Sequence, residues 1–172
     1  MHDVERLFRQ YHETLVRYLT RRLGDRDWAE EVAQETFVRA LRQERIVNER
    51  AWLFTVANNL VRDEARKDAR HRKHLALLFE EGRDAAIEPE PTTLERAQEA
   101  AMARKAVDAL AERDRLALLM REEGLDYHEI AEALGLSVGS IGTTLARARR
   151  RLVEQYEALQ QEMESRRGHA AS

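Results

Sequence analysis

The stretch DYHEIAEALGLSVGSIGTTLARARRRL, residues 126–152, decides the fold of the C-terminal part of the chain. Asp126, followed three residues later by Glu129, is the pattern of a capping box at a helix start. Gly135 readily adopts the left-handed backbone of a tight turn, and Ser137 is a suitable N-cap for a second helix. The spacing A-x3-G-x5-I puts a small residue, the turn and a branched residue where two crossing helices need them. The stretch therefore predicts a helix-turn-helix.

All charged side chains in the central part of the second predicted helix of this motif are basic. The segment from Ile141 to Arg151 contains four arginines and no acidic residue. Along a recognition helix, such side chains would lie beside DNA phosphates. An ordinary helical hairpin with a solvated basic face has the same local pattern. The caps on both helices and the uniform charge favour the DNA-binding interpretation.

The rest of the chain is predicted to be all-α, with two small helical domains joined by an acidic, Pro-containing linker. Ala, Leu, Glu and Arg, which favour helices, are abundant, and the only prolines are Pro89 and Pro91. The expected parts are lobe one at residues 1–79, the linker at 80–91, lobe two at 92–155, and a helical extension with a flexible tail at 156–172.

Capping patterns predict where the other helices begin. Gly24 is suited to end the first helix, and Asp27 with Glu30 resembles a capping box for the second. Asn48 is expected to begin a third helix, and Thr92 to begin the first helix of lobe two. Beyond the helix-turn-helix, an apolar stripe is expected to pack on its own lobe, formed by Leu152, Tyr156, Leu159 and Met163. The final segment SRRGHAAS is expected to be disordered.

Composition restricts the classes of protein. The 172 residues include no Cys, which excludes disulfides, iron–sulfur clusters and thiolate zinc sites. Apolar runs are too short for a transmembrane helix, so we expect a soluble, cytoplasmic chain without membrane insertion. The net charge of −3 averages unlike parts: residues 1–79 carry +3, residues 80–99 carry −5 and residues 100–172 carry −1. A basic lobe, an acidic tether and a basic recognition helix are compatible with binding to DNA.

Three stretches, in order, resemble the extracytoplasmic-function group of bacterial RNA polymerase sigma factors. The first is DWAEEVAQETFVRAL (27–41), similar to the family's "D-A-E-D-L-V-Q-E-T-F" helix. The second, AWLFTVANNLVRDEARK (51–67), is similar to "A-W-L-x-x-I-A-x-N-x-x-x-D". The third runs from Leu110 to Leu152 and includes the helix-turn-helix. A lone helix-turn-helix is weak evidence, whereas this ordered triple is specific.

The resemblance implies three sets of binding residues and no cofactor or metal. Contacts to the β′ clamp helices of core RNA polymerase would be made by Glu31, Gln34 and Glu35. The minus-ten promoter element would be melted and read by Asn58, Asn59, Arg62, Arg66, Lys67 and Arg70, with Asn59 near a flipped base. The minus-thirty-five element would be read by Ser137, Ser140, Thr143, Thr144, Arg147, Arg149 and Arg150.

Further partners are implied at the level of the family. Lobe two would also contact the polymerase β flap, and an anti-sigma factor would hold the protein inactive. The chain departs from the family pattern at Gly142 and Thr144, where basic residues are usual. Their loss is expected to weaken phosphate binding and its salt dependence.

Two other classes of function are compatible with parts of the sequence. An enzymatic metal site would suit the D-x-x-H-x-x-H pattern of Asp68, His71 and His74, but the neighbouring cations repel a metal ion. The sequence contains no phosphate-binding Gly loop and no nucleophile elbow. A helix-turn-helix regulator with a helical sensor or dimerisation lobe, not bound to polymerase, is the alternative. Such a regulator would not need the QETF and AWLxxxAxN stretches in this order.

Overall fold

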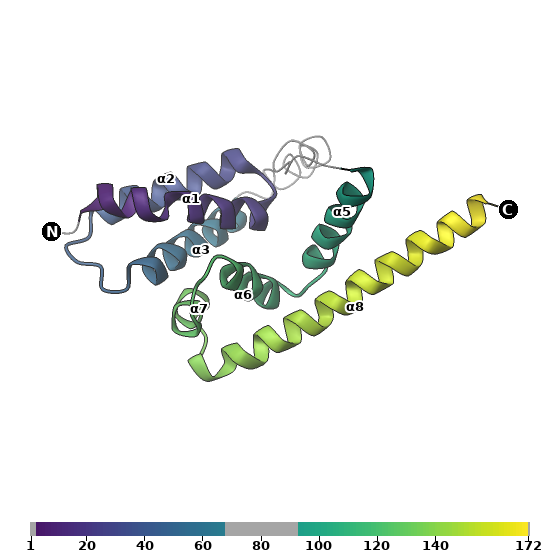
Figure 1. The fold of residues 1–172 in the computed structure, drawn as a ribbon. Helices are drawn as coiled ribbons and strands as arrows, with labels where there is room; N and C mark the ends of the chain where they lie inside the picture. Colours follow the sequence, from purple (N-terminus) through teal and green to yellow (C-terminus); the bar gives the residue numbers. More distant parts are fainter. Residues whose placement is uncertain (1–2, 68–92, 172) are drawn as a thin grey trace.

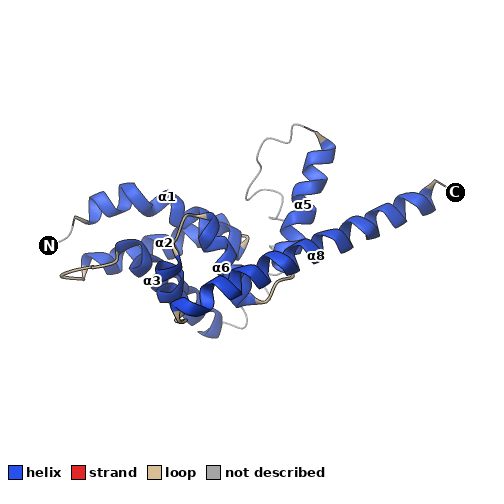
Figure 2. Ribbon diagram, turned by 60° about the horizontal axis from the view of Figure 1, so that its bottom comes forward, coloured by secondary structure: helices blue, strands red, loops and turns tan. Residues whose placement is uncertain are grey.

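The computed structural model describes residues 3–67 and 93–171, and all regular elements in these ranges are helices (Figure 2). The all-α class and its two helical lobes are as predicted. The proposed linker at residues 80–91 and the Asp68–His74 pattern lie outside the described residues. The helices are α1 (Val4–Leu23), α2 (Arg26–Leu41), α3 (Glu49–Lys67), α5 (Leu94–Asp108), α6 (Glu112–Glu122), α7 (Tyr127–Leu134) and α8 (Val138–Ala170).

Lobe one consists of α1, α2 and α3 packed around a shared apolar core. Gly24 ends α1 with a φ of 72°, the left-handed conformation that the sequence predicts. The N-cap of α2 is Asp25, whose carboxylate accepts a hydrogen bond from the Trp28 amide at 3.1 Å. The prediction of Asp27 as this cap was wrong. Because Gly24 already turns the chain, Asp27 lies in the first turn of α2, where its negative charge interacts favourably with the helix dipole.

Lobe two contains α5, α6, α7 and α8. The N-cap of α5 is Thr93, one residue after the predicted Thr92, and its hydroxyl accepts from the Arg96 amide at 3.2 Å. The helix-turn-helix is confirmed: α7 and α8 are separated by three residues that include Gly135, with a φ of 67°.

Helix α8 has 33 residues and runs antiparallel along α5 (Figures 1 and 2). The start of α5 lies beside the end of α8, where Arg167 donates to Gln98 at 3.1 Å. The Leu152 to Met163 stripe is half-buried, as expected for packing on its own lobe. The segment expected to be disordered continues α8 to Ala170. Its residues do not break a helix, and α5 provides a neighbour for it.

The buried apolar side chains form one cluster that extends from lobe one into lobe two. Leu15, Leu53 and Phe54 of lobe one belong to the same cluster as Met120 and Ile130 of lobe two. Helix α3 packs on α7, and α1 packs on α6. The two lobes are therefore in direct apolar contact in this conformation. Among the described helices, none is long and apolar enough to cross a bilayer.

Candidate nucleic-acid and polymerase interfaces

Local hydrogen bonds fix the helix-turn-helix. The Asp126 carboxylate accepts from the Glu129 amide at 2.8 Å, and the Glu129 carboxylate accepts from the Asp126 amide at 3.0 Å. This complete capping box satisfies two amides that the first turn of α7 leaves without helical partners. Ala131 and Ile141 are buried where the two helices cross. The first turns of α8 are therefore held rigidly against α7, with their other side toward solvent.

The outer side of α8 carries most of the residues predicted to read the minus-thirty-five element. Ser137, Thr143, Arg149 and Arg150 are exposed and Ser140 is half-buried. Thr144 does not line this surface. It is buried, and its hydroxyl donates to the Ser140 carbonyl at 2.8 Å.

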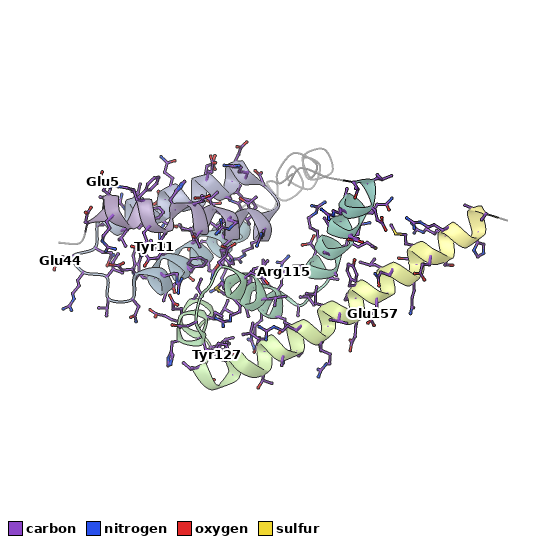
Figure 3. The ribbon with its side chains drawn as sticks, in the orientation of Figure 1. Glu5, Tyr11, Glu44, Arg115, Tyr127 and Glu157 are labelled. Carbon is purple, nitrogen blue, oxygen red and sulfur yellow. The ribbon has the colours of Figure 1, made fainter. Side chains whose placement is uncertain are left out.

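Gly142, the other departure from the family pattern, faces α7. A Cβ added there would lie 3.7 Å from Cε2 of Tyr127, in ordinary van der Waals contact. The Tyr127 ring is itself partly exposed, with the Arg121 guanidinium 5.8 Å from its centroid (Figure 3). This part of the α7–α8 surface is thus formed by an aromatic ring beside a glycine.

Arg147 is engaged inside lobe two. Its guanidinium donates to both carboxylate oxygens of Asp114 on α6, at 3.1 and 2.7 Å, and Arg151 approaches the same carboxylate at 3.8 Å. Asp114 is only 1% exposed. These cations hold the pKa of the Asp114 carboxyl below its usual value, chiefly through the hydrogen bonds from Arg147. Sequence reasoning missed Asp114, although its place one helical turn before the buried Leu118 was a signal for burial.

The two asparagines of α3 lie in different environments. Asn59 and Arg62 are exposed, whereas Asn58 is 2% exposed. Arg66 and Lys67 belong to the last turn of α3, and Arg70 lies outside the described residues. Of the residues predicted to meet the minus-ten strand, Asn59 and Arg62 are thus on the exposed side of α3, and Asn58 is not.

Both polar atoms of the Asn58 side chain form hydrogen bonds with protein groups. Its Oδ1 accepts from the Tyr18 hydroxyl at 2.8 Å and from Arg22 Nη1 at 2.7 Å. Its Nδ2 donates to the carbonyl of Ala133 in the last turn of α7, at 3.3 Å. Burial raises the pKa of Tyr18 to about 12, so its hydroxyl remains a donor at neutral pH. Asn58 therefore connects α1, α3 and α7, and its amide is occupied in this conformation.

The predicted polymerase-binding residues share one side of α2. Glu31 and Gln34 are exposed, and Glu35 is half-buried and accepts from Arg39 at 3.3 Å. Positions three and four apart lie on the same helix face, so the two carboxylates and the amide form one acidic strip. The opposite side of α2 is apolar and buried in lobe one. The strip is accessible while the lobes are in contact.

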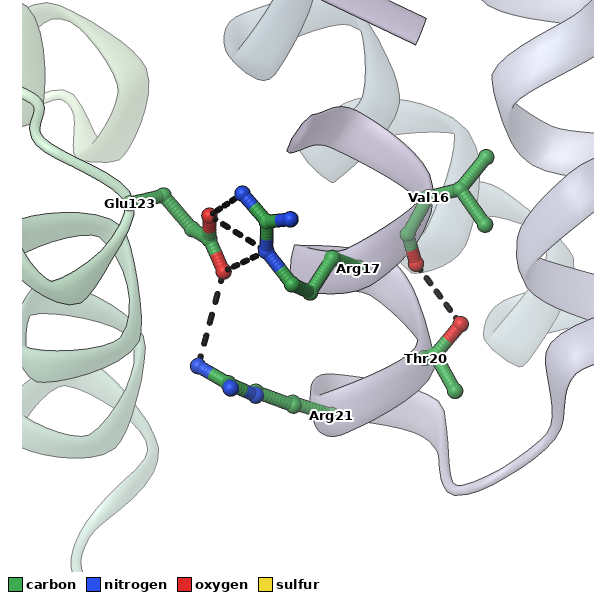
Figure 4. Close-up of polar contacts among 5 residues, drawn as sticks. All are labelled: Val16, Arg17, Thr20, Arg21 and Glu123. Carbon is green, nitrogen blue, oxygen red and sulfur yellow. Dashed lines mark hydrogen bonds and ion pairs between the residues drawn. The ribbon is translucent and has the colours of Figure 1, made fainter. Parts of the chain in front are cut away.

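Two bidentate ion pairs join the lobes, and sequence reasoning identified neither. Arg17 of α1 donates to both carboxylate oxygens of Glu123 at 2.8–3.0 Å, and Arg21 approaches the same carboxylate at 3.5 Å (Figure 4). The Glu123 side chain is only 3% exposed. Arg50 of α3 donates twice to Glu129 of α7, at 2.6 Å each. These two ion pairs add polar links between the lobes to their apolar contact.

Comparisons with known proteins identify the family of this chain. Residues 7–71 match the sigma-70 region 2 family and residues 100–152 match the sigma-70 region 4 family. The chain is 32% identical to the RNA polymerase sigma factor YlaC of Bacillus subtilis, over 86% of this chain and 88% of that protein. It is 33% identical to the ECF RNA polymerase sigma factor SigL of Mycobacterium tuberculosis, over 85% and 84%.

A solved structure has the same fold. The sigma factor RpoE of Bartonella quintana, in complex with the anti-sigma factor NepR, has a TM-score of 0.65 and 24% identity, over 89% of this chain and 96% of that one. Regions 2 and 4 follow one another here in the order in which sigma factors carry them, and the curated relatives match across both lobes. The chain therefore belongs to the extracytoplasmic-function group of RNA polymerase sigma factors.

Proposed function

We propose that this protein binds bacterial core RNA polymerase and directs promoter-specific transcription initiation. The observation that carries this conclusion is the presence of both sigma regions in one chain, with an acidic strip on α2 and a basic outer side on α8. A regulator that used only a helix-turn-helix would not need a region 2 lobe. The chain contributes binding and orientation, and polymerase performs the chemistry. The site of action would be the cytoplasm, where polymerase works.

Lobe one would dock through α2. The strip of Glu31, Gln34 and Glu35 is complementary to a partly basic partner, and the β′ clamp helices would be that partner. Because the strip is a rigid helical face with an apolar, buried back, docking requires no rearrangement of lobe one. Lobe two would contact the β flap.

Lobe one would also capture the opened minus-ten strand along α3. Asn59 offers both a donor and an acceptor to the edge of an extruded base. Arg62, Arg66, Lys67 and Arg70 would follow the strand and its phosphates. Asn58 would join them only after its bonds to Arg22 and Ala133 are broken.

Lobe two would place α8 in the major groove of the minus-thirty-five element. Ser137, Ser140, Thr143, Arg149 and Arg150 form the surface that would meet DNA. Arg147 would orient the helix through Asp114, with Thr144 packed beneath it. An anti-sigma factor is the expected regulatory partner, as for the relative solved with NepR.

Reconstituted transcription tests this function. Purified core polymerase with the wild-type chain should give promoter-specific transcripts from fragmented genomic DNA, and mapping their starts should reveal two shared promoter elements. The variant Glu31→Ala/Gln34→Ala should lose core binding, whereas the control Glu30→Ala/Arg26→Ala, an exposed ion pair on the same helix, should retain it. If the chain bound duplex DNA tightly but never associated with polymerase, the regulator alternative would replace this function.

A further inference from the structure

An exposed cation on α6 lies beside the helix-turn-helix and is not used in the function proposed above, on which this inference rests. Arg121 is in the last turn of α6, and its guanidinium lies 5.8 Å from the centroid of the Tyr127 ring. Its Nη1 donates to the Leu125 carbonyl at 2.9 Å. Among the residues that the structure describes, no carboxylate forms an ion pair with Arg121. Arg121 is thus a positioned charge that the described part of the chain does not neutralise.

The Tyr127 ring connects this cation to the recognition helix. Tyr127 is the first residue of α7, and it lies where α7 meets the first turns of α8 (Figure 3). A Cβ at Gly142 of α8 would be 3.7 Å from Cε2 of this ring, so no side chain separates the ring from the backbone of α8. Positions seven apart lie on one side of a helix, so Gly142 and the exposed Arg149 face the same way. Arg121 therefore continues the basic surface of α8 across Gly142 and Tyr127 onto α6.

We propose that Arg121 binds a backbone phosphate of the minus-thirty-five duplex at the edge of the major groove. When a recognition helix enters the major groove, the helix before it crosses the DNA backbone. The start of α7 is therefore brought to the phosphates, and the guanidinium of Arg121 lies against the residue that begins α7. A planar guanidinium can donate two hydrogen bonds to the oxygens of one phosphate. Leu125 and Tyr127 position this group, and Arg121 makes the contact.

Two contacts hold the guanidinium in place before DNA binds. A long arginine side chain loses rotational freedom when it binds a phosphate, and this loss opposes binding. The Leu125 carbonyl accepts from one nitrogen, and the face of the Tyr127 ring attracts the cation. The nearby Asp126 carboxylate accepts from the Glu129 amide at 2.8 Å and not from Arg121. The bond to Leu125 leaves further N–H groups of the guanidinium for a phosphate, and part of the entropic cost is already met.

The salt dependence of binding to duplex DNA tests this contact. The probes are two fluorescein-labelled duplexes, one of random sequence and one with a mapped minus-thirty-five element, because a phosphate contact does not depend on sequence. The full chain is titrated onto each duplex, alone and loaded on core polymerase. Arg121→Gln should reduce the slope of log affinity against log salt by about 0.9 on both duplexes. It should also weaken binding at low salt by up to about fivefold, the range of an exposed charge pair.

The matched control is Arg104→Gln, which removes the same charge from an exposed position of α5. This helix packs on α8 away from the helix-turn-helix (Figure 1). The control should therefore keep the slope of the wild type. Circular dichroism checks that every variant is folded.

Variants of the two neighbours separate a phosphate contact from a structural role of Arg121. Tyr127→Leu removes the ring but no charge, and its salt slope should fall because the guanidinium no longer meets the phosphate. In the presence of Arg121→Gln, Tyr127→Leu should have no further effect on the slope, and Tyr127→Phe, which keeps the ring, should retain the wild-type slope. Gly142→Lys places a cation against the same ring, where an added Cβ is in ordinary contact. It should therefore restore the slope that Arg121→Gln loses.

The outcomes separate this contact from the proposed function. If Arg121→Gln keeps the wild-type slope, or if the wild-type chain binds neither duplex alone or with polymerase, the inference is wrong. If Arg104→Gln lowers the slope as much as Arg121→Gln, the effect is one of net charge and the inference is equally wrong. If the slope depends on Arg121 but the chain directs no transcription by polymerase, the phosphate contact stands and the proposed sigma function fails instead.

Discussion

The pair formed by Asp114 and Arg147 should respond unequally to removal of its two partners. Asp114 is 1% exposed, whereas the Arg147 side chain is 36% exposed. In Asp114→Asn, the freed guanidinium can turn to water, and one hydrogen bond to the amide oxygen can remain. In Arg147→Met, the apolar stem is kept but the buried carboxylate loses its principal partner. Arg151, at 3.8 Å, is then the nearest remaining cation.

The unequal exposure of Asp114 and Arg147 determines how much stability each variant should lose. Asp114→Asn should lower the free energy of unfolding by about 1.5–2 kcal/mol, the lower part of the usual cost of losing hydrogen bonds to a charged group, because one bond can remain. Arg147→Met should cost about 3 kcal/mol or more, because it leaves a buried charge without adequate compensation. The native-state pKa of Asp114 is lowered, so its contribution is present above the unfolded pKa of about 3.9 and is lost as the pH falls below it.

Urea unfolding followed by circular dichroism measures both costs. At pH 7 the Arg147 variant should be the less stable of the two, and toward pH 3 the gap should narrow as the carboxyl takes up a proton. Leu118, also on α6, reports separately on core packing through Leu118→Val. An equal cost for Asp114→Asn and Arg147→Met at pH 7, or a gap between them that does not change in acid, would contradict this account of the pair.

Four further outcomes follow from the same structure. Tyr18→Phe should lower the free energy of unfolding by about 1 kcal/mol through the lost hydrogen bond to Asn58. Between pH 10 and about 12 the wild type, but not this variant, should lose additional stability, because Tyr18 ionises in the unfolded chain before it ionises in the folded one. Urea unfolding at pH 9 and pH 11 measures both effects. Gly135→Ala should lower stability by about 1–2 kcal/mol because its φ is 67°, while Gly139→Ala, in the open first turn of α8, should not lower the melting temperature. Arg149→Ala and Arg150→Ala should each reduce the slope of log affinity for duplex DNA against log salt by about 0.9 if each side chain meets one phosphate; anisotropy titrations over a salt series would detect an unchanged slope. Asn59→Ala should leave unfolding unchanged within about 0.5 kcal/mol but reduce promoter opening, measured by permanganate footprinting, and a large loss of stability would contradict its exposed position.

Local features of the fold were predictable because they depend on neighbouring residues. The Asp126–Glu129 box and the Gly135 turn involve groups within a few positions, and both are confirmed. The start of α2 was displaced by two residues because Asp25 and Asp27 are both acceptable caps by composition. Only the turn at Gly24 decides between them. Capping patterns thus predict that a helix begins, and the preceding turn determines where.

The burial of Asn58 could also have been inferred from the sequence. Phe54 precedes it by four positions and Val61 follows it by three, and both are buried, so Asn58 lies on the same inner side of α3. Because Asn58 and Asn59 are both polar, residue type alone does not distinguish the buried position from the exposed one, and only the helical periodicity does. The resemblance to the family points to Asn59 alone as the base-contacting position, and the helical phase agrees with that choice.

Long-range ion pairs were not predictable. Arg50 and Glu129 are 79 positions apart, and Arg17 and Glu123 are 106 apart. With 29 basic and 32 acidic residues in the chain, composition permits a very large number of pairings. Only the packing of α1 on α6 and of α3 on α7 selects these two. The three stretches that resemble the family therefore do not predict the contact between the lobes.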